Sequence, residues 1–261
     1  MKFHPILLAI SFGAVVYRIL DFIFYRRFAK STMEKLSRPQ SLNELAENAI
    51  RKAIVEGQLK FGDHLSEVRL SQMLGISKTP VREALLKMRT EGLIESHPKR
   101  GTYVFRVRPE DIDALCEVRE VLELAAVRLG IARRHAQLAS GLSAVVSRMR
   151  KALDAHDFRA YQRLDAEFHG VIVESAANPY LVEAYAQISA KIATLRTRVH
   201  TMPDVMARSL VTHGKIARLA ANSDLDGLAA LLSTHVRNTG RYAKKWLASQ
   251  SVDETESVTA S

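Results

Sequence analysis

Apolar residues recur every three or four positions along most of this chain, which is the spacing of one face of an α-helix. The spacing becomes regular after Ser41 and continues to about residue 248. Two short stretches, residues 93–96 and 102–105, instead have the pattern of strands joined by a tight turn. The pattern therefore predicts a mainly α-helical protein, and the scarcity of glycine and proline, 12 and 7 of 261 residues, agrees with it.

The same pattern divides the chain into four parts. Residues 1–40 form an N-terminal extension, residues 41–108 a small domain, residues 109–248 a larger helical domain, and residues 249–261 a polar tail that we expect to be disordered. A length of 261 residues suits two ordinary domains, and 47% apolar residues are enough to give each a hydrophobic core.

The small domain has the element order of a winged helix-turn-helix, with three helices followed by a β-hairpin. Its second helix is predicted at Glu67–Leu74, with Ser66 as the N-cap, and its third helix starts near Thr79. Gly75 closes the turn between them, because glycine tolerates the left-handed conformation at a helix end. A helix pair joined in this way commonly binds DNA, and the hairpin would form the wing.

The charge distribution favours a polyanionic partner for the N-terminal part. Residues 1–40 hold seven Lys/Arg against two Asp/Glu, and residues 41–108 hold twelve against eight, which gives +5 and +4 of the total +10. Residues 109–261 hold nineteen against eighteen and are nearly neutral. A basic module beside a neutral one is typical of nucleic-acid binding, although charge alone fits a solvated basic surface equally well.

Basic and hydroxyl side chains fall where this fold meets DNA. The third helix would enter the major groove with its N-terminus first, where hydroxyl, Lys, Arg and backbone N–H groups can contact phosphates and base edges. Arg82, one turn into that helix, is the strongest candidate for reading a base. The full set of DNA-binding candidates is Arg69, Ser77, Lys78, Thr79, Arg82, Lys99, Arg100 and Gly101.

The larger domain reads as a bundle of about six helices. They are predicted near 110–134, 140–155, 158–176, 180–200, 205–221 and 225–248. Four polar residues lie on or beside the apolar faces of three of them, namely Asp165, His169, His213 and His235. A shared divalent metal would satisfy all four, and imidazole with carboxylate suits Zn²⁺, Ni²⁺ or Mn²⁺. The residues alone fit equally well a hydrogen-bonded core network without a metal.

Residues 54–104 resemble the GntR family of bacterial regulators, and the match is carried by residues 65–104, LSEVRLSQMLGISKTPVREALLKMRTEGLIESHPKRGTYV. The segment GISKTPVREAL at residues 75–85 carries most of the resemblance. Phe61 departs from the proline that is usual in the family, which affects only a turn. Lys78 stands where arginine is usual, and lysine lacks the planar bidentate fork, which predicts weaker base discrimination there.

Residues 111–242 resemble the FCD effector domain of FadR-type members of that family. The resemblance implies an all-helical bundle with a metal at the floor of a ligand pocket, held by an Asp-x-x-x-His pair and two later histidines. The matching residues are Asp165, His169, His213 and His235. The other six histidines, His200 among them, do not match.

The resemblance also implies a small carboxylate or sugar acid as the effector. Arg119 lies on the apolar stripe of the first bundle helix and is the first candidate for clamping a carboxylate, with Arg196 as the second. A salt bridge to a neighbouring helix explains each arginine equally well.

Together these features predict a cytoplasmic, homodimeric transcriptional regulator that binds a palindromic operator and responds to a metabolite. Either sign of regulation is compatible with this interpretation, and repression is our working expectation. We expect no enzymatic activity and assign no catalytic residue. The alternatives are a constitutive DNA-binding protein without metal or effector, and a helical metal-dependent hydrolase. The hydrolase lacks an evident nucleophile or general base and leaves residues 65–104 unexplained.

The N-terminal extension contains an apolar run of twelve residues, 6–17, which is short of the roughly 20 that a membrane span needs. It is either a tether, with the basic residues that follow keeping the rest of the chain cytoplasmic, or untranslated sequence upstream of a start at Met33. We favour the start at Met33 and consider membrane association the less expected outcome. The single cysteine, Cys116, falls within a helical pattern and is expected to be a core residue.

Overall fold

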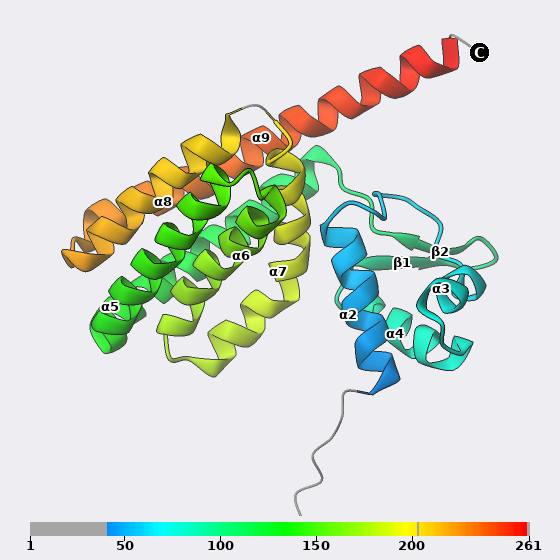
Figure 1. The fold of residues 1–261 in the computed structure, drawn as a ribbon, viewed down its shortest axis with the longest axis horizontal. Helices are drawn as coiled ribbons and strands as arrows, with labels where there is room; N and C mark the ends of the chain where they lie inside the picture. The colour runs from blue at the N-terminus through cyan, green and yellow to red at the C-terminus, as the bar shows by residue number, and fades with distance from the viewer. Residues whose placement is uncertain (1–40, 203, 260–261) are drawn as a thin grey trace, which may run out of the picture. The chain divides into compact units, whose positions relative to one another are not determined.

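The computed structural model describes residues 41–202 and 204–259, with side chains up to residue 250 (Figure 1). Its elements are α2 (Leu42–Val55), α3 (Glu67–Leu74), α4 (Lys78–Thr90), β1 (Ile94–His97), β2 (Gly101–Val104), α5 (Pro109–Asp154), α6 (Phe158–Ser175), α7 (Pro179–Val199), α8 (Val205–Ala221) and α9 (Leu225–Thr259). The described part is therefore mainly helical with one two-stranded sheet, as the sequence predicts.

The first three helices and the hairpin form the winged helix-turn-helix. The Ser66 hydroxyl accepts from the Arg69 amide at the start of α3, and Gly75 ends this helix with a φ of 66°. Both features confirm the sequence prediction. At the start of α4, the Ser77 side chain makes no capping hydrogen bond. Ser77 has the extended backbone of an N-cap. Because its hydroxyl does not cap the helix, the hydroxyl is available to another partner.

The wing is an antiparallel pair in which Ile94 lies opposite Val104 and His97 opposite Gly101. The strands are shifted by one residue from the predicted bounds. Leu93 and Phe105 nevertheless continue the pairing through a 3.0 Å hydrogen bond from the Phe105 amide to the Leu93 carbonyl.

The five C-terminal helices form the predicted bundle, in which α5 packs against α6, α8 and α9 (Figure 1). Fully buried side chains from several helices meet along α5. Among them are Ile112, Leu142 and Met149 of α5, Phe168 of α6 and Leu232 of α9. The break between α6 and α7 falls at Asn178, whose side chain accepts from the amides of Tyr180 and Leu181, as suits an N-cap followed by proline.

Two helix boundaries differ from the sequence prediction. The first two predicted bundle helices are one element, α5, in which only Arg134 leaves the helical conformation, at φ −142° and ψ 39°. Residues 135–139 contain neither glycine nor proline, so the helix resumes at once instead of forming a loop. Helix α9 also continues through the polar segment for which we expected disorder, up to Thr259, because residues 249–259 contain no helix breaker.

The tether and late-start interpretations concern residues 1–40, which lie outside the described residues. Within residues 41–202 and 204–259, none of the helices is both long enough and apolar enough to cross a membrane.

Candidate DNA-binding surface and buried histidine cluster

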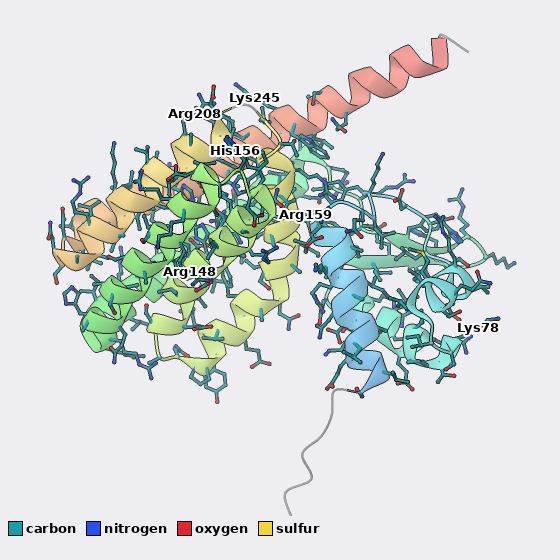
Figure 2. All side chains as sticks on the ribbon, in the orientation of Figure 1. Lys78, Arg148, His156, Arg159, Arg208 and Lys245 are labelled. Carbon is teal, nitrogen blue, oxygen red and sulfur yellow. The ribbon has the colours of Figure 1, made fainter. Side chains whose placement is uncertain are left out.

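The DNA-binding candidates on α3 and α4 are exposed to solvent. Lys78 and Thr79 occupy the first turn of α4, and Figure 2 shows Lys78 pointing outward from this domain. Arg69 is exposed on α3. Lys78 and Thr79 lie at the end of α4 that carries the unpaired N–H groups and the positive end of the helix dipole, an arrangement that suits a phosphate group.

Arg82 is held in a defined orientation by Glu67, a residue that the sequence analysis did not single out. Its Nε lies 3.0 and 3.1 Å from the two carboxylate oxygens, and its Nη2 lies 2.8 Å from one of them. The hydrogen bond from Arg82 lowers the pKa of Glu67. An arginine has five N–H donors, so the remaining guanidinium edge can still meet a base or phosphate. Because the Arg82 side chain is 63% exposed, that edge is accessible.

The wing places its three candidates at one tip. Lys99 and Arg100 are exposed in the turn between the strands, where Lys99 has a φ of 62° and the Arg100 carbonyl accepts from the Tyr103 hydroxyl at 2.6 Å. Gly101 has a φ of 106°, a conformation that residues with a side chain rarely adopt, and an added Cβ would lie 2.7 Å from the Nε2 atom of His64, so the exposed His64 ring would have to move. Glycine at this position therefore allows the tight turn that presents the two basic residues.

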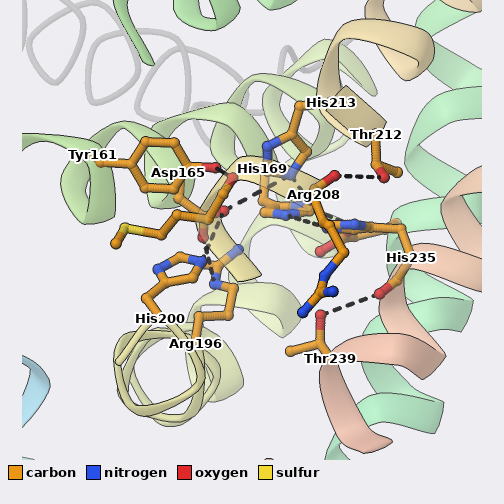
Figure 3. Close-up of polar contacts among 12 residues, drawn as sticks. Tyr161, Asp165, His169, Arg196, His200, Arg208, Thr212, His213, His235 and Thr239 are labelled. Atoms are coloured by element: carbon orange, nitrogen blue, oxygen red, sulfur yellow. Dashed lines mark hydrogen bonds and ion pairs between the residues drawn. The ribbon is translucent and has the colours of Figure 1, made fainter. Parts of the chain in front are cut away.

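Three of the four predicted metal ligands converge in the bundle core (Figure 3). Helices α6, α8 and α9 supply His169, His213 and His235, and one ring nitrogen of each lies within 4.8 Å of the other two. The Nε2 atom of His235 is 3.2 Å from that of His213 and 3.4 Å from that of His169. All three side chains are buried.

The geometry and protonation of this cluster fit a divalent metal. With metal–nitrogen bonds of about 2.0–2.1 Å, two tetrahedral ligand atoms lie about 3.4 Å apart, close to the observed spacings. Burial lowers the pKa of all three histidines, that of His213 to about 4. The imidazoles are therefore neutral at pH 7, and their lone pairs are available to a metal.

Asp165, the fourth predicted ligand, lies at the side of the histidine cluster. Its Oδ1 is 3.8 Å from the Nε2 atoms of both His213 and His200, and its Oδ2 is 3.1 Å from the Nε of Arg196. Burial alone would raise the pKa of Asp165, but the positive charge of Arg196 holds it well below the usual range. His200, which we had set aside, therefore belongs to this site. It lies one helical turn after Arg196, and this spacing could have revealed it.

Glu123 fixes the orientation of His169 through Nδ1, the ring nitrogen that does not face the cluster. Its Oε2 lies 2.9 Å from His169 Nδ1, while its Oε1 accepts from the Arg119 Nε at 2.7 Å and the Tyr185 hydroxyl at 3.0 Å. A carboxylate can only accept, so Nδ1 carries the proton and Nε2 keeps its lone pair. A carboxylate that accepts from a ligating histidine in this way is a usual partner at metal sites. Neither Glu123 nor Tyr185 was found from the sequence.

Arg119 lies in this buried network. Its ion pair with Glu123 is formed within α5, and its Nη2 donates to His169 Nε2 at 2.8 Å, the same lone pair that a metal would take. Arg119 therefore forms a salt bridge, as one of its two explanations held, but with a residue of its own helix and not of a neighbouring one. Arg119 would have to move aside for a metal to bind to His169.

A cavity of about 480 Å³ opens beside the cluster. Asp165, Arg196 and His235 line it, so a metal at the cluster would lie at its wall. Arg196 is only 5% exposed, and its Nη1 has no hydrogen-bond partner among the described residues. Buried donors are nearly always paired, so this N–H group is suited to a ligand in the cavity. Of the two predicted effector-binding arginines, Arg196 is the one that faces the cavity.

Comparison with known proteins assigns each of the two domains to a known family. Residues 42–104 match the family described as "Bacterial regulatory proteins, gntR family", and residues 114–238 match the FCD domain. An uncharacterised HTH-type regulator of Agrobacterium vitis is 33% identical over 135 residues, 51% of this chain and 79% of that protein. The HTH-type transcriptional repressor RspR of Escherichia coli is 24% identical over 213 residues, 81% of this chain and 92% of that protein.

A probable D-xylose utilization operon repressor of Paenarthrobacter nicotinovorans is 27% identical over 165 residues, 63% of this chain and 72% of that protein. Among solved structures, E. coli McbR/YncC superimposes with a TM-score of 0.70 at 22% identity. A putative GntR regulator from Rhodococcus gives 0.67 at 21% identity. Each alignment covers 79% of this chain and 99% of the other, which establishes a shared fold.

Proposed function

Because this chain belongs to the GntR family of bacterial transcriptional regulators and carries an FCD domain, we propose that a small carboxylate, bound beside a metal in its bundle, controls its binding to DNA. Regulation of transcription through DNA binding follows from the family. The metal and the effector are the proposal. The observation that carries it is the convergence of three neutral histidine Nε2 atoms at the wall of a cavity that also contains an unpaired, buried arginine N–H.

His169, His213 and His235 would hold the metal, with Asp165 as the fourth ligand. With four protein ligands a tetrahedral ion has no open position, so the proposal requires an ion that takes five or six ligands and can accept a carboxylate oxygen in addition to these four. Arg196 would donate from Nη1 to the same carboxylate, and Glu123 would keep His169 in the tautomer that coordinates. Asp165 and an incoming carboxylate both attract Arg196, so effector binding would weaken the Asp165–Arg196 pair.

The DNA-binding form would be a cytoplasmic homodimer on a palindromic operator, with two copies of α4 in successive major grooves about 34 Å apart. Repression is supported by the names of the E. coli and P. nicotinovorans relatives. The second name refers to D-xylose utilization, so sugar acids belong among the effectors to be screened. An effector changes DNA affinity only as far as it binds the two conformations of the protein differently.

The proposal is tested by metal analysis and DNA binding on the full chain. After exposure to Zn²⁺, Ni²⁺ or Mn²⁺ and dialysis, we expect about one ion per chain, and none in His213→Asn. His135→Asn is the matched control, because His135 lies outside the cluster, where it contacts the Ala220 carbonyl. A wild-type protein without metal would favour the constitutive DNA-binding alternative.

A mobility-shift assay with the DNA upstream of the coding sequence tests the effector. Carboxylates and sugar acids are added to the wild-type complex and to that of Arg196→Gln. We expect at least one of them to change the affinity of the wild type and to have a weaker effect on the variant. If the metal-loaded protein binds the operator equally with and without every carboxylate tested, the effector part of the proposal is wrong.

A further inference from the structure

A second cavity, of about 340 Å³, lies between α2 and the bundle helices α6 and α7, and we call it the interdomain cavity. Helix α2 packs against α7, where Arg198 donates from Nη2 to the Ile54 carbonyl at 3.2 Å. Asp165, Arg196 and His200 line both this cavity and the one beside the histidine cluster (Figure 3). A volume of this size is within the range of small-metabolite sites, and the proposed function assigns no ligand to it.

The lining of the interdomain cavity is strongly basic. It contains five Arg/Lys and two Asp/Glu, which gives a net charge of +3 with histidine neutral. Three of the five cations have a carboxylate partner, in the pairs Arg51–Glu47, Lys52–Glu56 and Arg196–Asp165. The other two, Arg159 and Arg163, make no hydrogen bond or ion pair with any residue that the structure describes. The excess charge therefore comes from these two arginines, and it suits an anion.

The placement of Arg159 and Arg163 suits a phosphate group. They lie four residues apart on α6, so they project from the same face of the helix, one turn apart, and both are exposed. Two guanidinium groups can hold one phosphate between them, because its terminal oxygens accept several hydrogen bonds at once. A phosphate monoester carries about −1.5 to −2 charges at pH 7, which matches two positive charges better than a single carboxylate does.

The buried part of the lining needs a neutral polar partner. His200 is only 5% exposed, its Nε2 faces Asp165, and its Nδ1 has no hydrogen-bond partner among the described residues. Buried polar atoms are nearly always paired, and a hydroxyl group can pair with Nδ1 in either tautomer because it both donates and accepts. Val55, Ala166 and Ala193 add apolar side chains to the lining, which suit the carbon skeleton of a ligand.

We propose that the interdomain cavity binds a hydroxylated phosphate monoester, such as a sugar phosphate, with the phosphate between Arg159 and Arg163 and a hydroxyl group at His200. Because α2 supplies one side of the cavity and α6 and α7 the other, the ligand would contact both domains. The site needs neither a metal nor a carboxylate effector, so it does not depend on the proposed function.

Calorimetric titration of the full chain, with metal removed by a chelator, tests the site. Erythrose 4-phosphate, ribose 5-phosphate and glucose 6-phosphate are each compared with the unphosphorylated sugar and with inorganic phosphate. For at least one of the three we expect the ester to bind about tenfold tighter or more than both. If none of the esters binds more tightly than its parent sugar, the proposal is wrong. If an ester and inorganic phosphate bind equally, the contact of a hydroxyl group with His200 is wrong.

Arg159→Gln and Arg163→Gln should each weaken binding of the ester about tenfold. Arg148→Gln is the matched control and should bind the ester as the wild type does, since Arg148 is an exposed arginine of the bundle that pairs with Glu167 and does not line the cavity. His200→Gln places an amide near the position of Nε2 and removes Nδ1, so it should weaken binding of the ester and not of inorganic phosphate. A general loss of structure would weaken the binding of both ligands.

Two further outcomes would overturn the proposal. If an ester binds only the Zn²⁺-loaded protein, its phosphate is bound at the histidine cluster and not in the interdomain cavity. If no ester binds and Arg159→Gln and Arg163→Gln weaken operator binding in a mobility-shift assay, the two arginines contact the phosphates of DNA instead. Binding of an ester to the metal-free protein that both variants weaken would support the proposal, whether or not a carboxylate effector is found.

Discussion

Replacing Glu123 with glutamine tests the buried network behind the histidine cluster. The substitution keeps the size of the side chain and removes its charge. Glu123 and Arg119 are both 0% exposed, so Glu123→Gln leaves the guanidinium without its counter-charge in the core. Breaking a buried ion pair in this way costs about 3–5 kcal/mol of stability, a large share of the total for a domain.

The same change should weaken metal binding. Glutamine offers one acceptor and one donor group, so it cannot accept from His169 on one side and from Arg119 and Tyr185 on the other. His169 then loses the partner that holds its Nδ1 proton. Loss of such a partner costs about 10–100-fold in metal affinity, or about 1.4–2.7 kcal/mol.

Two measurements are needed, namely urea unfolding of the metal-free protein and competition for Zn²⁺ against a chelating dye. Glu120→Gln is the matched control on the same helix. Its carboxylate accepts from Ser233 at 2.6 Å and Arg237 at 3.1 Å, but it is partly exposed, so we expect a change of at most about 1 kcal/mol in stability and none in metal affinity. Equal stability of the two variants would refute the argument from burial. A less stable Glu123→Gln with unchanged metal affinity would show that Glu123 supports the core and does not position His169.

Four further predictions concern other parts of the molecule. Arg82→Ala should weaken specific operator binding by about 1–3 kcal/mol in a mobility-shift titration. Arg89→Ala, two turns further along α4, is the control and should weaken binding much less. Equal losses would show that Arg82 contributes only its general positive charge. Glu67→Gln should also weaken operator binding, but by less than Arg82→Ala, if Glu67 only orients the guanidinium. Burial raises the pKa of Cys116, so at pH 8 the native thiol should be less ionised than a free cysteine and react slowly with a thiol-specific dye. Unfolding in urea should restore the ordinary rate, and fast labelling of the native protein would contradict the burial. Chelation of the metal should lower the melting temperature of the bundle. Restoring free Zn²⁺ to about a thousand times its Kd should raise the free energy of unfolding by about 4 kcal/mol. An unchanged melting temperature would mean that the metal does not stabilise the bundle.

The local sequence was sufficient to predict the winged helix-turn-helix. The signals for this fold act between residues that are close in the chain. Ser66 caps α3 by accepting from the amide of Arg69, three residues later, and Gly75 adopts the left-handed conformation that ends the helix. The strand pair is joined by a turn of three residues, so its register also follows from local sequence. The periodicity of apolar residues likewise predicted the helices of the bundle, with two errors. It predicted two helices where α5 is a single helix distorted only at Arg134, and it ended the last helix at residue 248, whereas α9 continues beyond it.

The sequence also indicated three of the buried histidines, His169, His213 and His235, because a polar residue on an apolar stripe is visible in the pattern of one helix, but it missed the fourth, His200. What that pattern cannot contain is which side chains on other helices a buried group will meet. Glu123 contacts residues of α5, α6 and α7, and Asp165 turned out to face Arg196 and His200 as well as the cluster. These partners are set by how the helices pack, since a hydrogen bond of about 3 Å depends on the rotation and offset of each helix against its neighbours. The tertiary structure alone therefore decided that Arg196 lines the cavity and that Arg119 is paired beside it.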